Sequence, residues 1–145
     1  MTQEQKDLLL KDLCARLPYG VKVQDTYYKS LEPAPIWLLD LNIQKVRMFA
    51  DEGYQSIEYI KPYLFPLSSM SEEQKKEISK RYNYHNHYEG CVEITYHSQG
   101  YWDDDNSCNL QDYLWLEDWY NKNHFDYRGL IDKGLAIDAT GLNIY

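Results

Sequence analysis

The segment YHNHYEGC holds the side chains of this chain that are best suited to bind a metal ion. If it forms a β-strand, His85, His87 and Cys91 point to the same face, because side chains alternate along a strand. Imidazole nitrogen and thiolate sulfur are common zinc ligands. The chain has no CxxC or HExxH pair, however, and zinc sites in small domains usually contain such a close pair. These three residues are therefore weak candidate ligands, and we expect neither a bound metal nor a cofactor.

A run of three aspartates invites comparison with a calcium-binding loop, in which ligands fall at alternate positions. The comparison fails at Cys108, where the sharp turn requires glycine, and at Leu114, where the bidentate glutamate should stand. Carboxylates just before a helix interact favourably with the partial positive charge of its N-terminus. We therefore expect Asp103, Asp104 and Asp105 to be a solvated approach to a helix.

Three titratable residues, His124, Asp126 and Arg128, lie close together after a predicted helix. Their spacing matches no catalytic pattern that we can assign. The C-terminal end of a helix favours a positive charge, so His124 has a structural role available to it there. We name no catalytic residue, and an enzymatic function is the less favoured interpretation.

Aromatic pairs provide the candidate interaction surface. Tyr27 and Tyr28 are adjacent, so on a strand they point to opposite faces and only one of them can enter the core. Tyr101 and Trp102 stand directly before the three aspartates. Tyrosine and tryptophan are enriched at the energetic centres of protein interfaces. The candidate interaction residues are Tyr27, Tyr28, Tyr101, Trp102, Asp103, Asp104 and Asp105.

Length, charge and cysteine content limit the class of protein. A chain of 145 residues is the usual size of one domain, and we treat residues 1–145 as a single globular unit. The formal charge of -8 argues against direct binding of nucleic acid, which requires local excess lysine and arginine. No apolar run approaches the length of a membrane span, and the first residues do not resemble a secretory signal. With three scattered cysteines, we expect a cytoplasmic protein with reduced thiols.

Residues 3–16 are expected to form the first helix, opened by a capping box between Thr2 and Gln5. Its apolar stripe comprises Leu9, Leu10, Leu13, Cys14 and Leu17, which makes Cys14 a buried, inert thiol. Alternating and β-branched runs then predict an antiparallel meander of four strands, ended by Pro62 and Pro66. The four predicted strands cover residues 21–27, 36–41, 45–49 and 56–60.

The second half of the chain begins with a surface helix that Ser71 and Gln74 cap and that ends near residue 82. Val92, Ile94 and Tyr96 predict a further strand. A helix over residues 109–122 presents an apolar arc of Leu110, Tyr113, Leu114, Leu116, Trp119 and Tyr120. A short last helix is expected over residues 127–133, with Gly134 as its left-handed terminator.

These elements predict an α+β fold. It consists of an antiparallel sheet of about five strands, an N-terminal helix, a surface helix and two C-terminal helices packed on the sheet. The order of the strands is left open.

Three stretches carry a resemblance to a known group of sequences: LCARLPYGVKVQ, KPYLFPLSSMSEEQKKE and WYNKNHFDYRGLIDKGLAIDA. Through them the chain resembles an uncharacterised family of small proteins from gut bacteria and their phages or mobile elements. The resemblance spans most of the chain and implies a location rather than an activity.

The leading functional hypothesis is a non-enzymatic cytoplasmic accessory protein, or protein-interaction module, of a phage or mobile element, with another protein as its partner. One alternative is an acidic mimic of nucleic acid that inhibits a host DNA-binding protein. The other is a small metal-dependent enzyme. An exposed apolar patch would favour the first hypothesis, one acidic face the second and a concave polar pocket the third.

Overall fold

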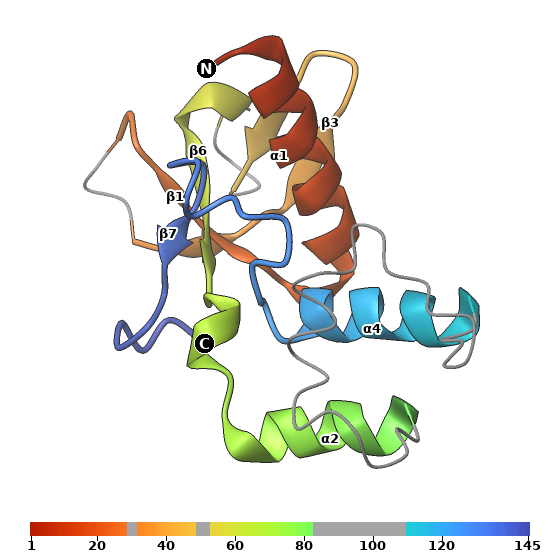
Figure 1. Cartoon of the computed structure of the whole chain (residues 1–145). Helices are drawn as coiled ribbons and strands as arrows, with labels where there is room; N and C mark the ends of the chain where they lie inside the picture. The colour runs from red at the N-terminus through yellow and green to blue at the C-terminus, as the bar shows by residue number, and fades with distance from the viewer. Residues whose placement is uncertain (29–31, 49–52, 83–109) are drawn as a thin grey trace.

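The computed structural model describes residues 1–28, 32–48, 53–82 and 110–145, which form an α+β fold (Figure 1). The described helices are α1 (Gln3–Arg16), α2 (Glu72–Tyr82) and α4 (Leu110–Lys122). Short 3-10 turns occupy Leu17–Tyr19, Ile57–Tyr59 and Leu67–Ser69. The strands are β1 (Lys22–Asp25), β2 (Ala34–Pro35), β3 (Leu38–Asp40), β4 (Lys45–Arg47), β5 (Gln55–Ser56), β6 (Ile60–Leu64) and β7 (Ile137–Asp138).

The strands form two sheets, so the predicted single antiparallel meander is wrong. The larger sheet has the order β2-β1-β6-β7, and the smaller one has the order β3-β4-β5. All pairs are antiparallel except β6 with β7, because the chain returns to the sheet after α4 and pairs parallel to β6. The predicted strand near residue 94 lies outside the described residues. None of the helices in the described part is long and apolar enough to cross a bilayer.

Pro62 does not end the strands but lies inside β6, at the centre of the larger sheet. Thr26 donates its N–H to the carbonyl of Tyr59 at 2.7 Å. Hydrogen-bonded and non-hydrogen-bonded pairs alternate along an antiparallel ladder, which makes Val23 and Pro62 a non-hydrogen-bonded pair. The nitrogen of Pro62 therefore faces away from β1, and β7 pairs only with the two residues that follow Pro62. The strand loses no ladder bond to the proline.

The first helix has the predicted bounds and the predicted capping box, in which Thr2 and Gln5 bond reciprocally. Leu9 and Leu13 are fully buried, as the apolar spacing requires. Cys14, however, is exposed, and the buried positions beside the leucines belong to Asp12 and Arg16. The expectation that Cys14 is a core thiol is therefore wrong, because two charged residues occupy the inward face instead.

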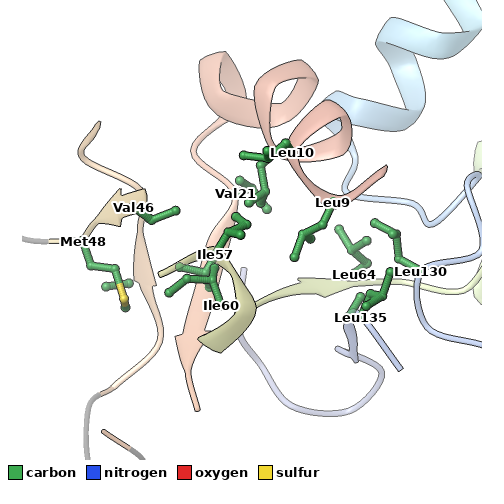
Figure 2. Packing of buried hydrophobic residues seen from close by; sticks show 14 residues of the cluster. Leu9, Leu10, Val21, Val46, Met48, Ile57, Ile60, Leu64, Leu130 and Leu135 are labelled. Atoms are coloured by element: carbon green, nitrogen blue, oxygen red, sulfur yellow. The ribbon is translucent and has the colours of Figure 1, made fainter. Parts of the chain in front are cut away.

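The main core lies between α1 and the two sheets (Figure 2). The apolar side chains of α1 meet the inward residues of β1, β4 and β6, and the chain after α4 closes one side. The 3-10 turn Ile57–Tyr59 replaces most of the strand predicted over residues 56–60 and turns Ile57 inward. The principal members are Leu9, Leu10, Leu13, Val21, Val23, Val46, Ile57, Ile60, Leu64, Leu130 and Leu135.

A second apolar cluster joins α2 to α4 below the sheet (Figure 1). Ser71 and Gln74 form the expected capping box of α2, and Ile78 on this helix is buried. On α4, Trp119 is buried and stacks on Phe125, with ring centroids 5.7 Å apart. Trp115 is only partly buried. Tyr113 and Leu114 are exposed, so the inward arc of α4 is narrower than its sequence suggests.

Residues 127–133 form turns, and the predicted last helix is wrong. The carboxylate of Asp126 accepts the N–H groups of Leu130 (2.8 Å) and Ile131 (2.7 Å). These bonds give the backbone a side-chain partner in place of a helical carbonyl. Gly134 is left-handed, with φ of 68°, as expected for a terminator. The turns deliver the chain to β7.

Replacing Trp119 with alanine should lower the free energy of unfolding by roughly 3 to 5 kcal/mol, because it removes a large buried ring and leaves a cavity. Urea unfolding followed by circular dichroism measures this change. Leu114→Ala, at an exposed position of the same helix, is the matched control and should change stability by less than about 0.5 kcal/mol. Equal stabilities of the two variants would show that the inward face of α4 has been assigned incorrectly.

Candidate functional site

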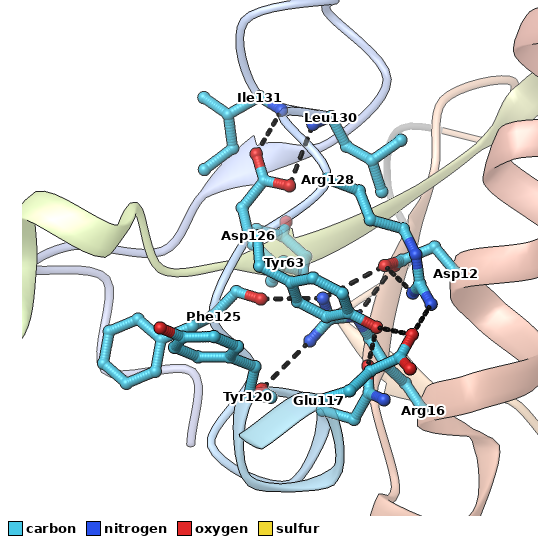
Figure 3. Close-up of polar contacts among 12 residues, drawn as sticks. Asp12, Arg16, Tyr63, Glu117, Tyr120, Phe125, Asp126, Arg128, Leu130 and Ile131 are labelled. Carbon is cyan, nitrogen blue, oxygen red and sulfur yellow. Dashed lines mark hydrogen bonds and ion pairs between the residues drawn. The ribbon is translucent and has the colours of Figure 1, made fainter. Parts of the chain in front are cut away.

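The largest group of interacting charged side chains surrounds a buried ion pair on α1 (Figure 3). Asp12 and Arg16 are one helical turn apart, and both are fully buried. Arg16 donates from Nε to Oδ2 of Asp12 at 2.8 Å and from Nη2 to Oδ1 at 3.0 Å. This bidentate geometry is the strongest form of an arginine–carboxylate pair.

Arg16 also bonds to the chain that leaves α4. Its Nη2 donates to the carbonyl oxygen of Phe125 at 2.7 Å, and its Nη1 donates to that of Tyr120 at 3.4 Å. The last carbonyls of a helix have no partner within the helix. The guanidinium therefore terminates α4 while it neutralises Asp12.

Arg128 extends the group of charges toward the surface. It donates to Asp12 at 2.9 Å and to Glu117 at 2.7 Å. The hydroxyl of Tyr127 lies 3.0 Å from Glu117 and 3.1 Å from Asn121. Burial raises the pKa of Tyr127 well above its usual value, so the hydroxyl keeps its proton.

This network is suited to structure rather than to catalysis. A general acid or base needs a proton-transfer group that faces substrate. Here both carboxylate oxygens of Asp12 accept bonds from arginines, and Asp126 is fully used by two backbone N–H groups. The carboxylates of Asp12 and Asp126 are therefore occupied by structural bonds.

His124 is buried beside the network in a left-handed backbone conformation, with φ of 59°. Its Nδ1 has no hydrogen-bond partner within the described part of the chain. Burial, and secondarily the charge of Arg16, lower the pKa of His124 to about 4. The residue has a structural place at the end of α4, but as a neutral ring and not as the cation that a helix C-terminus favours.

Most of the predicted site residues cannot be placed. His85, His87 and Cys91 lie outside the described residues, as do Tyr101, Trp102 and the aspartates 103–105. Within the described ranges, no group of three or more histidine, cysteine, aspartate or glutamate residues is arranged to hold a metal.

Tyr27 and Tyr28 are both exposed, by 61% and 56%, so the expectation that one of them enters the core is wrong. The chain turns away from the sheet directly after β1, because Oδ1 of Asp25 accepts the N–H groups of Tyr27 (2.7 Å) and Tyr28 (3.0 Å). Their rings meet at 4.8 Å, and the ring of Tyr27 lies 5.2 Å from that of Tyr59. We call Tyr27, Tyr28 and Tyr59 the tyrosine cluster.

A second exposed apolar group, which the sequence analysis missed, lies on and beside the smaller sheet. Arg47 stacks between the rings of Trp37 (5.5 Å) and Tyr54 (4.4 Å). The run PIWLLDLNI contains four exposed large apolar residues, a signal that was available in the sequence but was interpreted as a buried strand. We call this group the small-sheet patch: Trp37, Leu38, Leu41, Ile43 and Tyr54.

Comparison of the chain with protein-family models, curated proteins and solved structures found no match. The functional argument therefore depends on the chemistry of the described residues. The buried carboxylates of Asp12, Asp25 and Asp126 are bonded within the fold, whereas the tyrosine cluster and the small-sheet patch present aromatic side chains to solvent.

Replacing Arg16 with methionine should destabilise the fold by roughly 3 to 5 kcal/mol, because it breaks a buried pair and removes the bidentate partner of the fully buried Asp12. Chemical denaturation measures the loss. The control is Lys11→Met on the exposed face of the same helix, for which we expect a change below about 0.5 kcal/mol. A methionine variant as stable as the parent would mean that the pair does not hold α1 to α4.

His124 should make the fold sensitive to acid. Between pH 6.5 and about 4 the unfolded chain binds a proton on this imidazole that the folded chain does not, so stability is lost as the pH falls through that window. The loss attributable to this residue should reach roughly 3 kcal/mol at the acid end.

The matched variant is His124→Asn, since asparagine tolerates a left-handed backbone and does not titrate. Unfolding curves of both proteins from pH 7 to pH 4 test the assignment. As the pH falls from 7 to 4, the parent should lose roughly 3 kcal/mol more free energy of unfolding than the variant. Titration of the carboxyl groups lowers the stability of both proteins equally and cancels in the difference. Parallel pH profiles would contradict it.

Proposed function

We propose that this chain is a protein-interaction module, a non-enzymatic accessory protein of a phage or mobile element that acts in the cytoplasm. It binds its partner through the tyrosine cluster. The observation that carries the proposal is the exposure of three tyrosine rings in contact, of which Tyr27 and Tyr28 lie on a backbone turn that the buried Asp25 fixes. Such rings cost free energy to leave in water, and a partner that covers them recovers it.

The turn supports the proposal because it holds the rings in place before any partner arrives. Asp25 is 3% exposed, and its second oxygen accepts a bond from the side-chain amide of Gln55 at 3.0 Å. The carboxylate thus ties the two tyrosine N–H groups to the edge of the smaller sheet. A binding surface that is already ordered loses less conformational entropy on association.

The partner that fits this surface is a protein with a basic patch. The chain carries a formal charge of -8, and Glu58 stands beside Tyr59 with its carboxylate only partly screened by Lys6, 3.4 Å away. Arginine and lysine side chains are attracted both to acidic surfaces and to the faces of tyrosine rings. Tyr101, Trp102 and the aspartates 103–105 extend the same chemistry in the sequence and remain part of the proposed surface.

The two alternatives have less support. A mimic of nucleic acid needs its carboxylates in the solvent on one face. Acidic residues such as Glu4 and Glu73 are exposed, but Asp12, Asp25 and Asp126 are buried and bonded within the fold and cannot contribute to such a face. A metal-dependent enzyme would require ligands from His85, His87 and Cys91. Within the described ranges the polar groups form structural bonds and provide no reaction site.

Removing one ring of the cluster should weaken capture of the partner. Tyr28→Ala should reduce recovery of the specific partner at least about tenfold, because truncation of a central interface aromatic typically costs 2 kcal/mol or more. The measurement is affinity capture from the native host with quantitative mass spectrometry, in parallel with the parent protein.

Tyr113→Ala is the matched control, since Tyr113 is 44% exposed on α4 and outside the cluster. Circular dichroism and melting curves must show that both variants are folded. If Tyr28→Ala recovers the same proteins in the same yield as Tyr113→Ala, the tyrosine cluster is not the binding surface.

A further inference from the structure

Three side chains from separate parts of the chain surround the ring of Tyr145. The imidazole of His124 stacks on it, with ring centroids 3.9 Å apart and planes inclined by 11°. Phe65 meets it at 5.9 Å, and Nζ of Lys22 lies 6.0 Å from its centroid. The ring thus lies on a surface built by β1, the end of β6 and the end of α4.

The hydroxyl of Tyr145 is matched by two backbone groups of the larger sheet. It accepts the N–H of Lys22 at 3.1 Å and donates to the carbonyl oxygen of Tyr63 at 2.8 Å. Burial raises the pKa of Tyr145 to about 12, so the proton that this second bond needs is retained. A phenol hydroxyl can bond both backbone groups. A phenyl ring in its place would leave the N–H of Lys22 and the carbonyl of Tyr63 without this partner.

The surface beneath the ring is held in place independently of Tyr145. The carbonyl of His124 accepts the N–H of Phe65 at 2.9 Å, and the N–H of Asp126 is donated to the carbonyl of Phe65 at 2.8 Å. These bonds fix the imidazole and the phenyl ring relative to each other. His124 is 8% exposed, and its Nδ1 has no hydrogen-bond partner in the described ranges, so this ring nitrogen is available to bond a ligand.

The segment that delivers Tyr145 is held much more weakly. Residues 140–143 are exposed, and Tyr145 itself keeps 42% of its surface in solvent. Besides the ring, the segment is held by the bond from Lys22 Nζ to the carbonyl of Ile144 (2.6 Å). Two local bonds join it to the residues just before it: the N–H of Thr140 donates to Oδ1 of Asp138 (2.8 Å), and the N–H of Leu142 donates to the carbonyl of Ala139 (3.1 Å). The segment can therefore leave the surface without opening the core.

We propose that this surface, formed by His124, Phe65, Lys22 and the carbonyl of Tyr63, is a binding site for a tyrosine side chain. Tyr145 fills it in the free protein, and a tyrosine from another protein fills it when residues 140–145 are displaced. The site is separate from the tyrosine cluster and does not depend on the function proposed for that cluster.

The intramolecular tyrosine regulates access to the site. A tethered group competes at an effective concentration in the millimolar range or above, so the intact chain excludes weakly binding free tyrosine. A partner that presents tyrosine with additional contacts overcomes this competition. The segment 140–145 thereby acts as an autoinhibitory strap, and its release frees the site.

The test uses the full-length chain with Tyr145→Ala and two probes, N-acetyl-L-tyrosinamide and N-acetyl-L-phenylalaninamide, which differ only in the hydroxyl. Nuclear magnetic resonance titration reports binding through the ring protons of His124. We expect the tyrosine amide to bind the variant at least about tenfold more tightly than the phenylalanine amide, because the second probe leaves two backbone groups unmatched. The parent protein, whose site is filled, should show no saturable shift at His124.

Tyr145→Phe provides a second measurement. It should keep the ring in place, melt at a lower temperature than the parent, and exclude both probes. If Tyr145→Ala is unfolded, recovery of folding by the tyrosine amide alone would support the site, and failure of both probes to restore it would overturn the proposal. In a folded variant, equal binding of the two amides, equal binding to parent and variant, or no binding at all would each overturn it.

Discussion

The fold depends on the burial of one charged pair, Asp12 with Arg16. Removing a carboxylate and a guanidinium from water costs several kcal/mol for each ion, and only a complete set of hydrogen bonds offsets that cost. Asp12 obtains its set from Arg16 and Arg128, and Arg16 obtains its own from Asp12, the carbonyl of Tyr120 in the last turn of α4 and the carbonyl of Phe125 beyond it. The pair is satisfied only when α1, the end of α4 and the following turn are all in their native positions.

The bonds that satisfy the buried pair also position the residues around Tyr145. Phe125, whose carbonyl bonds to Arg16, also forms a parallel bridge with Phe65 at the end of β6. That bridge fixes His124 on one side and the Asp126 turn on the other, and the turn directs the chain into β7. Because β7 lies at the edge of the larger sheet, the segment after it returns across β1 and β6, where Tyr145 binds.

The sequence predicted what is determined locally. Capping boxes and apolar spacing located α1 and α2, since these signals involve residues three or four positions apart. The bonds from Arg16 to the carbonyl of Phe125 and from Arg128 to Asp12 each join residues more than a hundred positions apart. The Asp12–Arg16 pair at helical spacing looks, in the sequence, like an ordinary surface pair. The exposure of both Tyr27 and Tyr28 was not predicted for a related reason. The strand alternation holds only as far as Asp25, whose carboxylate accepts their backbone N–H groups and ends the strand.

Tyrosine content alone cannot separate structural from binding residues in this chain, because the same side chain serves both purposes. Tyr63 is buried, and its hydroxyl bonds to Gln24. Tyr127 is partly buried, and its hydroxyl bonds to Glu117 and Asn121. In the tyrosine cluster the rings are exposed and contact one another. Tyr145 is intermediate, since its hydroxyl is as well bonded as that of a core tyrosine while residues 140–143, which lead to it, are exposed. A side chain with core-like contacts on a weakly held segment binds stably, yet its displacement breaks few other contacts. Both properties are needed if Tyr145 is to be replaced by a tyrosine from another protein.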